Sequence, residues 1–182
     1  VSSPERGQAC VELGAEGYVD RSEFDHWGVP PLWDDAAGQK AWTKSAREFG
    51  KRIWEVVGER KSPRIVFEHP GQATIATSAF VCDSGGMIVI CAGTTGYTAT
   101  VDLRYHWVRQ KRLQGSHGTN DEQAYAYNDL VRQGAIDPVL ANGAAAPFDQ
   151  LPRIHRDMAD GILPPGNSAV LVGSPEAGGG RS

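Results

Sequence analysis

Short runs of β-branched and aliphatic residues alternate with amphipathic segments along most of this chain. Apolar runs of this kind, each ending at a turn, are typical of the buried strands of a parallel sheet. Elsewhere Trp42, Ala46, Phe49 and Ile53 recur at helical spacing, which predicts a helix over residues 41–57. Because strands and helices succeed one another, the predicted fold class is α/β with a doubly wound parallel sheet.

Capping and turn residues set the boundaries of these elements. Ser3 and Pro4 suit an N-cap and a first helical position, and Gly14 suits the end of that helix. Residues 21–39 are rich in aromatic residues and proline, and predict an inserted loop. The expected helices span residues 5–13, 41–57, 73–81, 104–108, 121–133 and 150–161. The expected strands span residues 16–20, 64–68, 87–92, 112–116 and 168–172.

Composition narrows the possible functions. The 182 residues, 40% of them apolar, are enough for one domain, or for one domain and part of another. The net charge is -4 and Lys and Arg form no dense run, so we expect no nucleic-acid partner. No apolar run is long enough to span a membrane, and a cytoplasmic protein is expected. The three cysteines show no disulfide or zinc-ligand spacing, so we expect buried thiols and no bound metal.

Three successive strands end in loops that carry glycine, hydroxyl or imidazole groups. These loops are Glu-His-Pro-Gly at residues 68–71, Ala-Gly-Thr-Thr-Gly at residues 92–96 and Gly-Ser-His-Gly-Thr-Asn at residues 115–120. Turn formation explains each loop taken alone, and a loop histidine such as His117 is more often structural than catalytic. Open parallel sheets bind ligands at the carboxyl ends of their strands, so the succession of the three loops indicates a ligand site.

These motifs, together with the aromatic insertion around residues 18–54, resemble the crotonyl-CoA carboxylase/reductases, a group of medium-chain reductases. The resemblance implies that residues 1–134 are the later part of a Rossmann-type NADPH-binding domain. It also implies that residues 135–175 return to the catalytic domain and that residues 176–182 are a flexible tail. The first strand and the G-x-G-x-x-G turn that hold a cofactor pyrophosphate do not occur in the sequence. The chain is therefore expected to be part of a longer or split reductase.

The resemblance also implies contacts to NADPH. Ser2, Ser3 and Arg6 follow the expected second strand, where hydroxyl and guanidinium groups without an acidic residue favour NADPH over NADH. Helix capping explains the two serines equally well. Arg21 is a further candidate for the 2′-phosphate. The other candidate cofactor contacts are His69, Gly71, Ala92, Gly93, Thr94, Ser116 and Asn167.

His117 and Asn120 resemble the catalytic pair of this family, in which the histidine helps to hold carbon dioxide through a water. The implied function is NADPH-dependent reduction, with reductive carboxylation, of an α,β-unsaturated acyl-CoA such as crotonyl-CoA to an alkylmalonyl-CoA. Carbon dioxide is then the co-substrate. The implied partners are the acyl-CoA, the rest of the reductase, and further subunits in a homodimer or tetramer paired through the edge strand at residues 112–116.

Three alternatives stay open. The family more usually has Phe-Ala where this chain has Gly118 and Thr119, which favours a non-carboxylating enoyl-CoA or acrylyl-CoA reductase, including a module of a propionyl-CoA synthase-like multienzyme. A second alternative is a non-catalytic assembly piece that contributes part of a fold to another chain. A zinc alcohol dehydrogenase is the third, and the lack of zinc-ligand spacing disfavours it.

Overall fold

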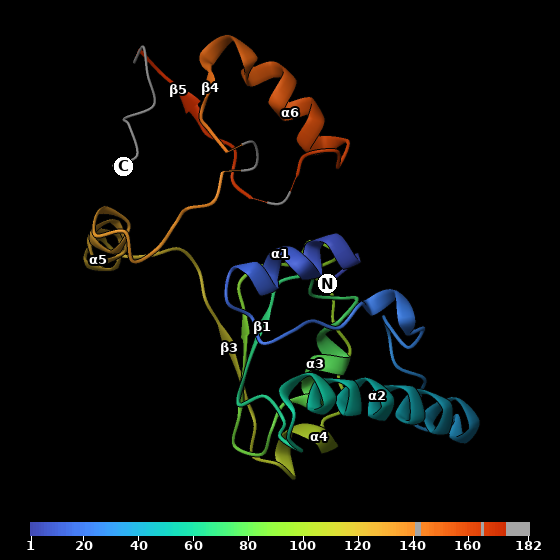
Figure 1. The fold of residues 1–182 in the computed structure, drawn as a ribbon. Helices are drawn as coiled ribbons and strands as arrows, with labels where there is room; N and C mark the ends of the chain where they lie inside the picture. Colours follow the sequence, from blue (N-terminus) through green and yellow to red (C-terminus); the bar gives the residue numbers. More distant parts are fainter. Residues whose placement is uncertain (141–142, 165, 174–182) are drawn as a thin grey trace. The chain divides into compact units, whose positions relative to one another are not determined.

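The computed structural model describes residues 1–140, 143–164 and 166–173. The chain forms two compact units (Figure 1), the first ending at Gly118 and the second beginning at Thr119. Each unit is described by itself. The sequence predicts a boundary after residue 134, between the NADPH-binding part and the segment that returns to the catalytic domain. The division into compact units does not test this boundary, which stays a prediction.

Unit 1 contains a parallel three-stranded sheet in the order β1-β2-β3. The strands are β1 (Ile65–Glu68), β2 (Met87–Ile90) and β3 (Arg112–Gly115). The helices of this unit are α1 (Pro4–Glu12), the 3-10 helix η1 (Arg21–Glu23), α2 (Ala36–Val57), α3 (Ile75–Val81) and α4 (Arg104–Trp107). The predicted class, α/β with a parallel sheet, is confirmed.

Helix α3 lies between the sheet and α2 (Figure 1). One side of the α3 region, Ile75 and Cys82, packs against Ile88 of β2. The other side packs through Ala76 against Trp42 and Ala46 of α2. Both sides of α3 are therefore buried, which explains why its sequence is apolar almost throughout.

The other face of β1 is open in unit 1. Ile65 and Phe67 alternate with the inward-facing residues of β1, and each is 69% exposed. Strands buried on both faces carry such side chains in parallel sheets. Within the described part of unit 1, the helices therefore leave this part of the sheet surface uncovered.

Helix α2 begins at Ala36, ahead of the predicted start at residue 41. The Asp35 side chain accepts a hydrogen bond of 2.9 Å from the Gly38 N–H and so caps the helix. The capping residue stands at the end of the proline-rich loop, where the periodic apolar pattern has not yet begun. The helix ends as predicted at Gly58, which has a φ of +76°.

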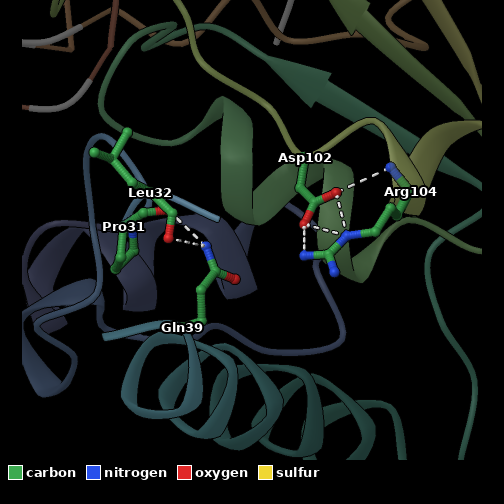
Figure 2. A network of polar contacts seen from close by, with 5 residues as sticks. All are labelled: Pro31, Leu32, Gln39, Asp102 and Arg104. Carbon is green, nitrogen blue, oxygen red and sulfur yellow. Dashed lines mark hydrogen bonds and ion pairs between the residues drawn. The ribbon is translucent and has the colours of Figure 1, made fainter. Parts of the chain in front are cut away.

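Polar contacts fix the ends of two unit 1 segments (Figure 2). Gln39 of α2 donates from Nε2 to the carbonyl oxygens of Pro31 at 2.5 Å and Leu32 at 3.4 Å, which ties the inserted loop to the helix. Asp102 accepts 2.9 Å hydrogen bonds from both the backbone N–H and Nε of Arg104, at the start of α4. These hydrogen bonds from Arg104 also lower the pKa of Asp102.

The strand predicted at residues 16–20 is not formed. The amino group of Val1 donates to the Val19 carbonyl at 2.9 Å, and the Arg21 N–H donates to the Val1 carbonyl at 3.0 Å. This is the hydrogen-bond pattern of a parallel pair. Because Val1 alone takes part, no ladder extends along residues 16–20, and the segment is extended without being a strand.

Unit 2 contains two helices, a 3-10 helix and a small parallel sheet. Its elements are α5 (Asp121–Arg132), β4 (Ala146–Pro147), η2 (Phe148–Gln150), α6 (Leu151–Ala159) and β5 (Val170–Leu171). The predicted helices at residues 121–133 and 150–161 are present, each shorter at its end, and β5 lies inside the predicted strand at residues 168–172. Strand β4, which pairs with β5, was not predicted, because its two residues follow an Ala-rich stretch without a strand pattern.

The flexible tail expected at residues 176–182 lies outside the residues that the structure describes. Within the described ranges, no helix combines the length and the apolar composition that crossing a membrane requires.

Candidate functional site

A pocket of about 480 Å³ in unit 1 brings together three of the residues predicted to contact NADPH. Ser2, Arg6 and Arg21 all line it, and all three are exposed. The pocket is also lined by aromatic side chains from the inserted loop and α2, Trp27 and Phe49. The prediction that the N-terminal segment and Arg21 serve one site is thus consistent with their positions.

Ser3, the fourth residue predicted for this region, has a different position. It caps α1, and its Oγ accepts a hydrogen bond from the Arg6 N–H at 3.4 Å. Pro4 occupies the first helical turn, as predicted. Ser3 therefore fixes the helix terminus that carries Arg6, and it does not belong to the described pocket wall.

The backbone of Arg21 is held on both sides. Its N–H donates to the Val1 carbonyl at 3.0 Å, and its own carbonyl accepts a hydrogen bond of 2.9 Å from the indole N–H of Trp27. The neighbouring Asp20 accepts hydrogen bonds from the N–H of Ser22 at 2.9 Å and from its hydroxyl at 2.8 Å, and these lower the pKa of Asp20. Arg21 therefore extends into the pocket from a fixed point of the chain.

The three strands of unit 1 end at one level. Glu68 of β1 is paired with Ile90 of β2, and Ile90 is paired with Gly115 of β3. The three loops that the sequence singled out therefore begin side by side at one edge of the sheet, as the ligand loops of open parallel sheets do.

The first two of these loops are bound to each other. The Thr95 N–H donates to the Pro70 carbonyl at 2.9 Å, and the Gln72 N–H donates to the Gly96 carbonyl at 3.2 Å. Because of these hydrogen bonds, the loops after β1 and β2 form one piece of structure. The predicted residues on them are His69 and Thr94, which are exposed, Ala92 and Gly93, which are half-buried, and the buried Gly71.

Gly71 of the first loop packs closely against the second loop. It has a φ of +82°, a conformation that side chains rarely adopt. A β-carbon at Gly71 would lie 2.9 Å from the Gly96 carbonyl oxygen and 3.0 Å from the Gly93 Cα. The glycine is therefore needed for the packing of these loops, whether or not a ligand binds them.

Glu68 holds the first loop against α3, a role that was not predicted. Glu68 is only 2% exposed, and it lines the pocket. Oε1 accepts hydrogen bonds from the Gly71 N–H at 3.0 Å and the Thr74 hydroxyl at 2.5 Å, while Oε2 accepts one from the Ser78 hydroxyl. A carboxylate is seldom buried without such partners, and the hydroxyls of Thr74 and Ser78, four positions apart at the start of a helix, were the available signal.

Ser116 and His117 follow β3 and are exposed. The Ser116 N–H donates to the Ile90 carbonyl at 2.8 Å, which continues the pairing of β3 with β2 beyond the strand end. His117 thus stands on the same edge of the sheet as the two joined loops. Its position agrees with the predicted site, while its catalytic role stays a prediction.

Asn120 and Asn167 belong to unit 2, and each has a structural task there. Asn120 caps α5: its Oδ1 accepts from the Gln123 N–H at 2.8 Å, and the Gln123 side chain accepts from the Asn120 N–H at 3.2 Å. Asn167 donates from Nδ2 to the Pro138 carbonyl at 2.6 Å and from its backbone N–H to the Val139 carbonyl at 2.8 Å. Their predicted roles toward substrate and cofactor stay predictions beside these structural roles.

The described part of the chain contains no cluster of residues that could bind a metal ion. No three His, Cys, Asp or Glu side chains of this part lie together in a way that could hold one.

No family model matches the chain, but individual proteins do. A crotonyl-CoA carboxylase/reductase of Cereibacter sphaeroides is 42% identical over 178 residues, which cover 98% of this chain. The structure of a crotonyl-CoA carboxylase/reductase, AntE, in complex with NADP covers 97% of the chain at 51% identity and a TM-score of 0.92. The resemblance to the crotonyl-CoA carboxylase/reductases is confirmed. A 2-octenoyl-CoA carboxylase reductase, CinF, solved with NADP and 2-octenoyl-CoA, matches at 33% identity and a TM-score of 0.79.

The chain spans well under half the length of these relatives. It covers 41% of the Cereibacter sphaeroides protein, 43% of AntE and 38% of CinF. The match therefore concerns the part of the fold that residues 1–182 form, and the activity of the whole protein is a matter of proposal.

Proposed function

We propose that the complete gene product to which this chain belongs is an NADPH-dependent enoyl-CoA reductase that carboxylates its substrate. The substrate class is an α,β-unsaturated acyl-CoA such as crotonyl-CoA, and the product is an alkylmalonyl-CoA. The observation that carries this proposal is the pocket lined by Ser2, Arg6 and Arg21 in a chain half identical to a crotonyl-CoA carboxylase/reductase solved with NADP.

The pocket residues fit the phosphorylated end of the cofactor. Two guanidinium groups and one hydroxyl suit the charge and the hydrogen-bond acceptors of a phosphate monoester. The joined loops after β1 and β2, with His69, Gly71, Ala92, Gly93 and Thr94, are the proposed contacts for the nicotinamide end. When bound, the cofactor supplies a hydride to the β-carbon of the acyl-CoA, which leaves an enolate at the α-carbon.

His117 is the residue to which we assign the fate of that enolate. Its imidazole is exposed at the end of β3, so it can hold a water or carbon dioxide by hydrogen bonding without contacting the cofactor. Asn120 is proposed to assist it, and Ser116 and Asn167 are proposed as further cofactor contacts. Losing one preorganised contact of this kind costs on the order of 10²-fold in the step it serves.

The test is the ratio of two products formed by the complete gene product from crotonyl-CoA, NADPH and bicarbonate, measured by mass spectrometry. His117→Asn should lower the carboxylated product on the order of 10²-fold while saturated acyl-CoA persists. His155→Asn, at an exposed position of α6, is the matched control and should leave the ratio unchanged. An unchanged ratio in His117→Asn would remove this residue from the carboxylation step.

Asn120 needs a separate pair of variants because it caps α5. Asn120→Asp keeps a capping side chain, whereas Asn120→Ala removes it and should cost about 1 kcal/mol of stability. If Asn120 acts only as a cap, the aspartate variant keeps the wild-type product ratio. A loss of carboxylation in both variants supports the proposed role beside His117.

A non-carboxylating enoyl-CoA reductase is the second candidate, and Gly118 and Thr119 favour it because they replace the aromatic and small residues usual in the family. A wild-type protein that forms only saturated acyl-CoA would select this candidate. A module of a propionyl-CoA synthase-like multienzyme would give the same result with acrylyl-CoA. A protein that neither binds nor oxidises NADPH would instead be a non-catalytic assembly piece.

Subunit pairing is also proposed. Strand β3 is at the edge of the described three-stranded sheet, so one row of its backbone groups is available for pairing. A homodimer, or a tetramer of such dimers, would pair two of these edges. Light scattering that gives a strict monomer for the complete gene product at micromolar concentration would contradict this.

A further inference from the structure

Besides Arg21, the inserted loop at residues 21–39 contributes the aromatic residue Trp27 to the described pocket wall. Its ring lines the pocket beside Arg21, and its indole N–H donates a 2.9 Å hydrogen bond to the Arg21 carbonyl. We propose that Trp27 is a positioning residue that sets the preference for a 2′-phosphorylated cofactor by holding Arg21 in place. This inference rests on the proposed function, because it assigns the phosphate to the pocket of Arg6 and Arg21.

Trp27 is itself held by the core of unit 1. It stacks on His26 with ring centroids 4.6 Å apart, and it meets the edge of Phe49 at 5.2 Å. His26 is buried, and its carbonyl accepts a hydrogen bond of 3.0 Å from the indole of Trp42 in α2. Phe49 and Trp42 both belong to α2, so the position of the Trp27 indole is set by a long helix rather than by the loop alone.

The Arg21 carbonyl also accepts a hydrogen bond of 3.2 Å from the Phe24 N–H, so the Trp27 indole adds a side-chain contact to a backbone turn. A third hydrogen bond of the Arg21 backbone leads to the segment that carries Ser2. The Arg21 N–H donates to the Val1 carbonyl, and Ser2 follows Val1 directly. Val1 and Trp27 therefore hold Arg21 from opposite sides. An arginine side chain that starts from a fixed backbone loses less freedom when it pairs with phosphate than one on a mobile loop.

A purely structural explanation of Trp27 is also available, namely that its ring only packs against Phe49. The two explanations differ in one respect. Packing alone would support every ligand of the pocket equally, whereas a hold on Arg21 favours ligands that carry the 2′-phosphate. Cofactor preference, rather than stability, therefore separates them.

Trp27→Phe is the informative variant because it keeps an aromatic ring and removes the N–H. In the complete gene product it should raise the KM for NADPH roughly 2- to 10-fold, the value of one hydrogen bond, and raise the KM for NADH less. Trp54→Phe is the matched control. It makes the same exchange at another tryptophan, one that lies in α2 outside the described pocket wall, and it should leave the ratio of the two KM values unchanged.

Binding provides a readout that needs no turnover. Adenosine 2′,5′-bisphosphate and adenosine 5′-monophosphate differ only in the 2′-phosphate, and calorimetry gives the affinity of each. Trp27→Phe should weaken the bisphosphate roughly 2- to 10-fold and weaken the monophosphate less. Equal effects on both ligands, or equal effects of Trp27→Phe and Trp54→Phe, would overturn the positioning role.

Arg21→Gln separates this inference from the function on which it rests. If Arg21→Gln weakens the bisphosphate selectively and Trp27→Phe does not, the inference fails and the pocket keeps its proposed ligand. If Arg21→Gln leaves the preference for the bisphosphate unchanged, the assignment of the phosphate to this pocket fails and the role of Trp27 fails with it.

Discussion

Gly7 of α1 lies directly against the aromatic ring of Tyr18, and a β-carbon at Gly7 would overlap that ring. Gly7 is buried in the interior of a helix, where glycine costs about 1 kcal/mol relative to alanine. The close approach to Tyr18 accounts for it. Since α1 also carries Arg6, the contact between Gly7 and Tyr18 helps to set where the pocket wall lies.

Gly7→Ala should therefore destabilise unit 1 by about 1–3 kcal/mol, the usual cost of overpacking a buried position. The matched change is Gly50→Ala in α2, whose added methyl would meet only Val81, at an ordinary 3.8 Å. That variant should be stabilised by up to about 1 kcal/mol. Urea unfolding measures both, and a Gly7→Ala variant as stable as the wild type would show that α1 adjusts freely around Tyr18.

The buried His26 should make stability depend on pH. Its Nδ1 lies 3.0 Å from the Ser45 hydroxyl, and its Nε2 is buried without a hydrogen-bond partner among the described residues. Burial lowers the pKa of His26 more than the nearby Asp25 raises it. Below the unfolded pKa of about 6.5, the unfolded chain binds a proton that the folded chain resists. This contribution to stability is present above about pH 6.5 and is lost as the pH falls below it.

The measurement is the thermal midpoint at several values between about pH 7.5 and pH 5.5. The midpoint of the wild type should fall with pH more steeply than that of His26→Gln, which cannot titrate. His155→Gln removes an exposed histidine from α6 and should keep the wild-type slope. Parallel slopes for the wild type and His26→Gln would mean that His26 is protonated equally easily in both states.

Glu68 should matter for stability more than its position at a strand end suggests. Glu68→Ala leaves the buried Gly71 N–H and the Thr74 hydroxyl without their acceptor, at a cost of about 1–3 kcal/mol for each group left unpaired. Glu48→Ala is the comparison, because the Glu48 carboxylate is exposed and lies 4.0 Å from the Lys44 ammonium. Its removal should cost less than about 0.5 kcal/mol in urea unfolding. Similar losses in the two variants would contradict the role assigned to Glu68.

Residues 1–182 by themselves should bind NADPH weakly. The sequence contains no G-x-G-x-x-G turn, so the backbone amides and the helix terminus that normally hold a pyrophosphate are not supplied by this chain. Calorimetric titration of the 182-residue chain should therefore give no micromolar site. A tight site would mean that the pocket with Arg6 and Arg21 and the strand-end loops suffice without that turn.

Local patterns were enough to predict the order of elements and the parallel sheet, because apolar runs and amphipathic periods record which faces are buried. The start of α2 was predicted too late because Asp35 acts through a capping hydrogen bond, which leaves no mark in the apolar period. The segment at residues 16–20, expected to be a strand, is extended in the structure, and the hydrogen bonds that Val19 and Arg21 make with Val1 follow the pattern of a parallel pair.

The site was only partly predictable. Ser2, Arg6 and Arg21 were predicted as contacts to one phosphate from the resemblance to the crotonyl-CoA carboxylase/reductases, and all three line one pocket. The role of Glu68 could not be predicted, because its burial depends on how α3 packs over the strand end. The sequence indicates only that Trp27 lies in the aromatic inserted loop, and the structure shows its hydrogen bond to the Arg21 carbonyl.

The packing of α3 also governs the reactivity of the thiols. The expectation of buried thiols is wrong for Cys10, which is exposed on α1, whereas Cys82 is 1% exposed where α3 meets the sheet. Burial raises the pKa of the Cys82 thiol, so in the folded chain it is both inaccessible and protonated, and alkylating reagents need the thiolate. Alkylation of Cys10 proceeds in the native state, while alkylation of Cys82 waits until α3 separates from β2. The rate at which Cys82 is alkylated therefore measures how often α3 separates from the sheet.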